Sequence, residues 1–513
     1  MSDSKSTKKL AIHGVLFNWI GRVASFLISF VLTPVLVRGL GDESYGVWSL
    51  LMTLTTYYAL ADLGLRGAGV KYISQYAATK DWDNVNKVLV TCLGLFLLFA
   101  ACLVPVVSLI AWRMPFHLNA EHVGLAAIRL VIVLTGATVV LGIPGQAFAA
   151  VLAATKRFDL SNALAVIAQL TQSVLLIFVV WRGGGIVEMA QVTLLVSVLA
   201  QVSRIVLAKV ALPQAHFSIQ WLDGEMAGRL IRFGILNVVQ GVGRLVSKSA
   251  GTVLVGFILG PVQVTYFSIA ESLTKKSSEL SRSICSVLMP VASQFDAQER
   301  HDDLKRMLLI GTSVLAALGA GLAIVFIVLG DTLISLWIGA RYVGTTFPIL
   351  CVLSISLVIT TASNGLRSIL RGTNRMRLLA GLGICEAVMT LALGVGLLNG
   401  YGLDGMPYAI LITQFVVSGV VLPYATCKAI DLPIGKYLAR GVFPGLSAAV
   451  PMLLFLTGAT AYVPPTNLVH LVIHGGIALI ILGCGVLFIC FEEDTRSAIL
   501  TSIPLPFLGA NRR

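Results

Sequence analysis

Residues Glu271 to Ser283, ESLTKKSSELSRS, form the most polar run of their length away from the two termini of the chain. The run lies between two apolar stretches, GFILGPVQVTYFSIA and ICSVLMPVA. It could be a loop that joins two short helices, or the polar face of one long helix. The two interpretations differ by one membrane crossing, so this run decides the topology of everything that follows it.

The composition indicates a helical protein that crosses a bilayer many times. Of the 513 residues, 57% are hydrophobic and 12% are charged, whereas soluble domains carry about 25% charged residues. Many segments exceed the roughly 20 apolar residues that a helix needs to cross a bilayer. The basic opening residues run into a segment that Asn18 and Arg22 interrupt. We therefore expect a cytoplasmic tail and a first anchor, not a cleavable signal peptide.

Hydrophobic segments recur along the whole chain and predict fourteen spanning helices if ESLTKKSSELSRS is helical. They lie at residues 14–39, 44–64, 88–112, 123–150, 160–181, 186–208, 231–256, 262–290, 307–329, 345–366, 378–399, 404–427, 441–462 and 468–491. An even number of crossings puts both termini on the same side, which we expect to be the cytoplasm. The predicted fold class is therefore an all-α polytopic membrane protein.

The distribution of basic residues tests this number of crossings. With the N-terminus in the cytoplasm, 25 of the 37 lysines and arginines fall on the cytoplasmic side, 4 fall outside and 8 lie within spans. This asymmetry follows the positive-inside rule. A miscounted helix in the middle would invert every later loop and destroy it, so ESLTKKSSELSRS is predicted to be part of one spanning helix. The net charge of +13 then reflects topology, and no nucleic-acid partner is expected.

A constant offset in the sequence indicates an internal repeat. Asn18 and Asn237 are 219 residues apart, and so are Gly41 and Gly260. Repeats of this kind are common in transporters, and they predict two six-helix halves followed by two added helices. The expected organisation is a cytoplasmic N-tail at 1–13, an N-lobe at 14–208, a cytoplasmic linker at 209–230, a C-lobe at 231–427, the two added helices at 428–491 and a cytoplasmic C-tail at 492–513.

Polar and charged residues inside the spans are the candidate functional residues, because charges in a membrane are costly and usually face a bundle interior or a water-filled cavity. At 100° per residue they follow one face of each of three predicted helices. The candidate substrate-binding residues are Asn18 and Arg22 in the first span, Asn237, Gln240, Arg244 and Lys248 in the seventh, and Lys275 and Arg282 in the eighth. Glu271 and Glu279 share the face of Lys275 at the four-residue spacing of helical ion pairs.

The economical place for three polar faces is one cavity between the two halves. Basic residues outnumber acidic ones there, and a low dielectric strengthens their charges, so the cavity should attract an anion. Arginine suits phosphate oxygens in particular. Glu271 and Glu279 are candidates for ion coupling. The alternative is structural, in which these residues form interhelical ion pairs that set the packing and touch no substrate.

No catalytic motif is present. The sequence holds no Walker loop, no GxSxG and no HExxH, so we expect neither an enzyme nor a chain that drives transport with ATP by itself. The eight cysteines form no CxxC pair and have no histidines at ligand spacing. Neither a metal nor another cofactor is therefore expected.

Two stretches resemble a known family. The run LTPVLVRGLGDESYGVWSLLMTLTTYYALADLGLRGAGVKYISQYAA and the later FDLSN (Phe158 to Asn162) are similar to polysaccharide-biosynthesis flippases. These flippases belong to the multidrug/oligosaccharidyl-lipid/polysaccharide exporter (MOP) superfamily. The resemblance implies a multi-pass protein of the bacterial inner membrane that moves undecaprenyl-pyrophosphate-linked oligosaccharide outward by alternating access. The substrate would serve O-antigen or exopolysaccharide assembly.

Several alternatives stay open. A peptidoglycan-precursor (lipid II) flippase and a cation-coupled multidrug exporter belong to the same superfamily, although a cationic drug would favour an acidic cavity. A membrane scaffold would not need ionised faces in three helices, and a polymerase would be expected to show a large outside loop. The expected partners are the lipid-linked substrate, membrane lipids and, beside them, a polysaccharide polymerase and a chain-length regulator.

Overall fold

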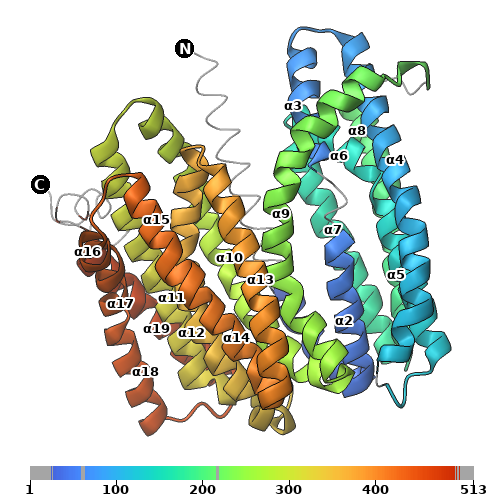
Figure 1. Cartoon of the computed structure of the whole chain (residues 1–513). Helices are drawn as coiled ribbons and strands as arrows, with labels where there is room; N and C mark the ends of the chain where they lie inside the picture. The colour runs from blue at the N-terminus through green and yellow to red at the C-terminus, as the bar shows by residue number, and fades with distance from the viewer. Residues whose placement is uncertain are drawn as a thin grey trace, which may run out of the picture. The chain divides into compact units, whose positions relative to one another are not determined.

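A computed structural model describes residues 25, 27–58, 64–118, 120–214, 219–491, 493 and 496, with the backbone alone at 58, 117, 219, 235–242, 244, 248, 283, 286 and 287. These residues are almost entirely helical and include no β-strand (Figure 1). They belong to two compact units. Unit 1 contains Met1–Ile269 and Gly383–Met406, and unit 2 contains Ala270–Leu382 and Pro407–Arg513.

Unit 1 holds the helices of the first half of the chain. After a helix at Leu27–Leu40 come α2 (Asp42–Tyr58), α3 (Leu65–Ala78), α4 (Trp82–Arg113), η2 (Met114–His117), α5 (Leu125–Gly142), α6 (Gly145–Ala154), α7 (Phe158–Trp181), α8 (Ile186–Ala211), η3 (Ile219–Trp221) and α9 (Gly224–Ile258). The first turns of α10 (Pro261–Ala297) and most of α13 (Met376–Tyr401) also belong to this unit, together with η5 (Gly402–Asp404).

Unit 2 holds the remainder of α10 and most of the later helices. They are α11 (His301–Trp337), η4 (Ala340–Tyr342), α12 (Val343–Gly372), α14 (Gly405–Thr413), η6 (Gln414–Val421), α15 (Leu422–Ala429), α16 (Ile434–Tyr437), η7 (Leu438–Val442), α17 (Phe443–Ala448), α18 (Val450–Tyr462), α19 (Leu468–Gly485) and η8 (Val486–Cys490). The segments η6, η7 and η8 are π-helical turns inside longer rods.

Nine helices within the described residues are long and apolar enough to cross a membrane. They are Trp82–Phe116, Leu125–Gly142, Phe158–Trp181, Ile186–Ala211, His301–Trp337, Ala340–Gly372, Met376–Ala429, Ile434–Tyr462 and Leu468–Cys490. Large apolar side chains such as Leu98, Leu454 and Val472 are exposed on these helices, as expected where the surrounding solvent is lipid. The chain is a multi-pass helical membrane protein, and the number of fourteen crossings stays a prediction.

The question posed by ESLTKKSSELSRS has a clear answer. The whole run lies inside α10, which is one continuous helix from Pro261 to Ala297. The prediction of a single helix is therefore confirmed. Another predicted segment, 123–150, is divided into α5 and α6 around Pro144. Proline has no backbone N–H to donate, so it favours such a break.

The core of unit 1 gathers where α3, α4, α6 and α9 meet. Ile73, Leu89, Phe96 and Leu230 are fully buried in one cluster there. A Cβ built on Gly69 would lie 3.3 Å from Ala150 and from Cys92, so α3 can pack closely against α4 and α6 only with a small residue at that position. The cluster fixes α9 to the first half of the chain.

Asp81 caps the N-terminus of α4. Its side chain accepts hydrogen bonds from the side-chain amide of Asn84 at 2.7 Å and from the backbone N–H of Asn84 at 3.1 Å. These bonds, the side-chain one first, hold the pKa of the Asp81 carboxyl below its usual value. A lowered pKa stabilises the fold above the unfolded pKa of about 3.9, and this stabilisation is lost as the pH falls through the folded value.

We therefore expect D81A to lower the thermal midpoint of the purified protein at pH 7. Asparagine caps a helix about as well as aspartate, so D81N should lower the thermal midpoint much less than D81A does. The difference between wild type and D81A should shrink as the pH is brought below about 4. Thermal unfolding in detergent from pH 7 to below about pH 4 measures this difference in thermal midpoint. An equal difference at every pH would contradict the role of the ionised cap.

The core of unit 2 surrounds α11, with α17, α18 and α19 packed on it. Ala317, Leu329, Met452 and Leu482 are among the buried residues of this cluster. A Cβ built on Gly445 of α17 would overlap the backbone oxygen of Ser313 in α11. The two backbones are therefore in direct contact, as is common between membrane helices that meet at small residues.

Basic residues gather at one end of unit 2. The connections α10–α11, α12–α13 and α15–α16 and the end of η8 all lie at this end (Figure 1). It carries Arg300, Lys305, Arg306, Arg371, Arg375, Arg377, Lys428, Lys436 and Arg440. At the opposite end, where α11 leads into η4, unit 2 carries Arg341. This asymmetry is the one that the positive-inside rule describes.

Candidate functional site

The middle of α10 carries five ionisable side chains within twelve residues, Glu271 to Arg282. The helix has 37 residues and is about 55 Å long at 1.5 Å per residue. It is not among the nine spans that qualify by apolar composition within the described residues. The sequence therefore places charges in the centre of a long helix, where hydrocarbon makes them costly.

Glu271 and Lys275 form the tightest contact in this group. The Glu271 residue is 7% exposed, and its Oε2 lies 2.8 Å from the Nζ of Lys275 one turn later. A buried carboxylate at this spacing from an ammonium is a compensated charge. The i,i+4 pairing of these two residues was expected from the sequence.

Glu279 and Arg282 are related more loosely. The Arg282 Nη2 is 4.0 Å from the Glu279 Oε1, and the two side chains are 47% and 41% exposed. Exposed pairs of this kind contribute little to stability. Both groups therefore remain available to another charged or polar partner, in contrast to Glu271.

The helix α12 packs against the neighbouring face of α10 through polar contacts. Asn364 donates from Nδ2 to the hydroxyl of Ser281 at 2.9 Å, and the Ser368 hydroxyl donates to the backbone oxygen of Cys285 at 2.7 Å. One turn further, a Cβ built on Gly372 would lie 2.7 Å from the Met289 oxygen. These contacts fix the rotation of α10 about its axis, and so the direction of its charged face.

Two polar residues were not predicted from the sequence. Arg367 lies inside α12, which continues beyond the predicted end at 366, and its Nη2 donates to the buried hydroxyl of Ser418 in η6 at 2.7 Å. Glu386 is only 6% exposed in α13 of unit 1. The signal for Glu386 was visible as the single carboxylate of the predicted span 378–399.

The predicted residues of the other two helices are placed only in part. Asn18 and Arg22 lie outside the described residues. Asn237, Gln240, Arg244 and Lys248 lie on the backbone of α9, whose side chains are not described at these positions. Within unit 1, α9 crosses α13 beside this stretch, because a Cβ on Gly243 would lie 2.5 Å from the carbonyl carbon of Gly383. One cavity shared by the three faces stays a prediction.

The described residues offer no obvious place for a metal ion. Among them, no group of three or more His, Cys, Asp or Glu side chains could hold one. All eight cysteines are free thiols, and only Cys92, Cys285 and Cys427 are buried. The candidate site among the described residues therefore consists of the charged side chains of α10.

A family model described as polysaccharide biosynthesis protein matches residues 11–296, which is more than half of the chain. The chain belongs to this family. The match includes α9 and nearly all of α10, so the charged middle of α10 lies inside the region that defines the family.

Two curated relatives extend the match over most of the chain. An uncharacterized membrane protein EpsK of Bacillus subtilis is 21% identical over 449 residues, covering 84% of this chain and 87% of its own length. A putative O-antigen transporter of Shigella flexneri is 22% identical over 402 residues, covering 77% of this chain and 92% of its own. The chain therefore matches most of the length of both relatives.

Solved structures show the same fold. The lipid II flippase MurJ in an inward closed conformation has a TM-score of 0.72 at 13% identity and covers 95% of this chain and 98% of its own. An inward-facing multidrug resistance MATE family transporter of the MOP superfamily has a TM-score of 0.70 at 16% identity, covering 80% and 98%. The fold of this polysaccharide biosynthesis family member is that of the MOP superfamily. The O-antigen relative and these two structures are described as transporters or a flippase, not as enzymes.

Proposed function

We propose that the protein flips undecaprenyl-pyrophosphate-linked oligosaccharide units across the bacterial inner membrane for O-antigen or exopolysaccharide assembly. The observation that carries the proposal is the group of ionised side chains in the middle of α10, in a member of the polysaccharide biosynthesis family. A buried, partly compensated charge inside a transporter helix marks a substrate or ion pathway by default. The relative described as a putative O-antigen transporter supports the choice of substrate class.

The balance of charge favours an anionic substrate. The candidate faces carry five basic residues (Arg22, Arg244, Lys248, Lys275 and Arg282) and two carboxylates (Glu271 and Glu279). Lys275 is already matched by Glu271, so the excess resides in the arginines and Lys248. These groups would contact the pyrophosphate through charge-assisted hydrogen bonds, with Asn18, Asn237 and Gln240 adding polar contacts. Glu279, which is only loosely paired, is the better candidate for ion coupling.

The proposed mechanism is alternating access between two lobes. Both termini would lie in the cytoplasm after fourteen crossings, with an N-lobe at 14–208, a C-lobe at 231–427 and the helices of 428–491 added outside them. Substrate binding would favour closure on the cytoplasmic side, and rocking of the lobes would release it outside. The basic end of unit 2 would then be cytoplasmic. A polysaccharide polymerase and a chain-length regulator would use the released product.

A lipid II flippase is the second candidate, because the MurJ fold covers 95% of this chain. A multidrug exporter shares the fold as well, but the excess of basic residues disfavours a cationic drug. Deletion of the gene separates the three candidates. A loss of surface polysaccharide with accumulated undecaprenyl-linked oligosaccharide supports the proposal, whereas accumulated lipid II with lysis, or altered drug tolerance with normal surface glycans, contradicts it.

The residues on α9 provide a sharper test. We expect R244A/K248A to reduce export of the oligosaccharide about tenfold or more, because each charge-assisted bond to phosphate is worth over 1 kcal/mol. R244E/K248E should abolish export. The matched control is R375A/K428A, which removes the same charge from exposed positions at the basic end of unit 2. Full export by both α9 variants at normal protein level would show that Arg244 and Lys248 are structural.

A further inference from the structure

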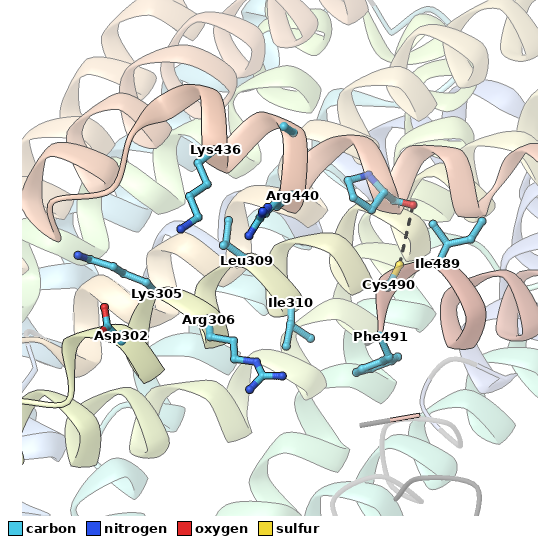
Figure 2. Close-up of a pocket in the computed structure, with 12 residues that line it drawn as sticks. Asp302, Lys305, Arg306, Leu309, Ile310, Lys436, Arg440, Ile489, Cys490 and Phe491 are labelled. Atoms are coloured by element: carbon cyan, nitrogen blue, oxygen red, sulfur yellow. Dashed lines mark hydrogen bonds between the residues drawn. The ribbon is translucent and has the colours of Figure 1, made fainter. Parts of the chain in front are cut away.

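A hollow of about 710 Å³ opens on unit 2, away from the charged middle of α10. Three segments distant in sequence form it: the first turns of α11, the α16–η7 rod, and the end of η8. In Figure 2, Lys436 and Arg440 extend from α16 and η7 toward Lys305 and Leu309 of α11. The Cys490 thiol lies 3.9 Å from the backbone oxygen of Pro444 in α17, the helix that directly follows η7.

The polar part of the hollow is strongly basic. Lys305, Arg306, Lys436 and Arg440 line it, against the single carboxylate of Asp302. Asp303, the residue after Asp302, accepts from Arg300 at 2.7 Å. The described lining residues therefore carry four basic side chains against one acidic side chain.

The remaining wall of the hollow is apolar. Leu309 and Ile310 stand one turn after the two α11 bases, and Ile489 and Phe491 close the side formed by η8. A site for free phosphate would need only basic side chains. An apolar wall next to a basic one instead suits an amphipathic molecule, which is charged at one end and apolar at the other. Exposed Phe488 and Ile489 extend this apolar surface along η8.

The position in the fold points to the same ligand. The hollow lies at the ends of membrane helices, where α11 and α16 begin and η8 finishes, and at the end of unit 2 that holds its basic residues. A lipid headgroup lies at this depth, with its acyl chains running along the helices. Basic pockets between membrane helices are known to bind anionic headgroups.

We propose that this hollow binds the phosphate headgroup of an anionic lipid of the surrounding bilayer, with the acyl chains on Ile489 and Phe491. Lys305, Lys436 and Arg440 would contact the phosphate oxygens, and Leu309 would separate the headgroup from the core of unit 2. The bound lipid would hold the start of α16 and the end of η8 against α11. The site is distinct from the substrate residues of α9 and α10, so it does not depend on the proposed transport function.

The test uses the full-length protein, delipidated in detergent and titrated with phosphatidylglycerol or phosphatidylcholine. Thermal stabilisation gives the apparent affinity, and native mass spectrometry counts the lipids retained. We expect wild type to prefer phosphatidylglycerol, and K436A/R440A to bind it about tenfold more weakly. The control R375A/K428A, with the same loss of charge outside the hollow, should bind like wild type. K436Q/R440Q provides a second variant if the alanine pair is poorly produced.

Two further measurements separate the sources of phosphate. F491A should weaken the binding of long-chain phosphatidylglycerol. It should leave the thermal stabilisation by inorganic pyrophosphate unchanged. Equal loss of lipid binding in K436A/R440A and in R375A/K428A would overturn the site, since it would indicate nonspecific attraction. Stabilisation by inorganic pyrophosphate at the affinity of phosphatidylglycerol would overturn the lipid as its ligand.

Discussion

K275A is expected to lower the free energy of unfolding by about 2–4 kcal/mol, because it removes the ammonium that compensates a buried carboxylate. The change removes the ammonium that lies 2.8 Å from the Glu271 carboxylate, while that carboxylate stays almost fully buried. Removing one member of a buried ion pair costs about 3–5 kcal/mol. The partial exposure of Lys275, 29% of its side chain, lowers the expected cost relative to that range, to about 2–4 kcal/mol.

The control and the rescue distinguish this effect from simple truncation. R282A removes a base that is half-exposed and 4.0 Å from its partner, so it should cost less than about 1 kcal/mol. E271Q/K275M replaces both charges and should recover most of the loss, since a buried pair is often replaceable by neutral side chains. Denaturant unfolding in detergent measures all three. An equal loss of unfolding free energy in K275A and R282A would show that the buried Glu271 carboxylate does not need the Lys275 ammonium.

G445A is expected to destabilise the protein by about 3 kcal/mol, although it adds one methyl group. The new Cβ would overlap the Ser313 oxygen and lie 2.9 Å from the Ala316 Cβ, and neither backbone can move without separating α17 from α11. The same α11 face supports the cluster of Ala317, Met452 and Leu482. Overpacking there therefore spreads into the core of unit 2.

The matched control lies in the next helix. Gly458 is in α18, and a Cβ built on it has nothing within 4 Å. Because alanine favours a helix over glycine by about 1 kcal/mol, G458A should be neutral or slightly stabilising. The two variants differ only in the space around the same added atom. A small effect of G445A in the same unfolding assay would mean that α17 and α11 do not touch at this depth.

Local rules predicted the helix of ESLTKKSSELSRS and the Glu271–Lys275 pair, because both depend on residues within one or two turns. The basic excess at one end of unit 2 also followed from the sequence. The Asn364–Ser281 bond and the hollow of α11, α16 and η8 could not be predicted in this way. The bond joins residues 83 positions apart, and the hollow joins residues from three separate helical segments, so both depend on how the helices pack.

Other features were visible in the local sequence but are not predicted from hydrophobic periodicity alone. The break between α5 and α6 at Pro144 was visible as a proline inside an apolar run. Glu386 was visible as a carboxylate in an otherwise apolar span. Arg367 lies one residue beyond the predicted span 345–366, whereas α12 continues to Gly372. Hydrophobicity marks the part of a helix that faces lipid, and the backbone hydrogen bonds continue beyond it.

The pairing of Glu271 with Lys275 has a consequence for motion. Both members stand on one helix, one turn apart, so any rigid displacement of α10 carries the charge and its counter-charge together. An ion pair between two helices must be broken when those helices separate, and each break adds to the activation barrier. An ion pair within one helix stays intact while that helix moves, so it does not have to be broken during the conformational change. The buried charge of α10 can therefore be kept neutral in every conformation without slowing the change from one to the next.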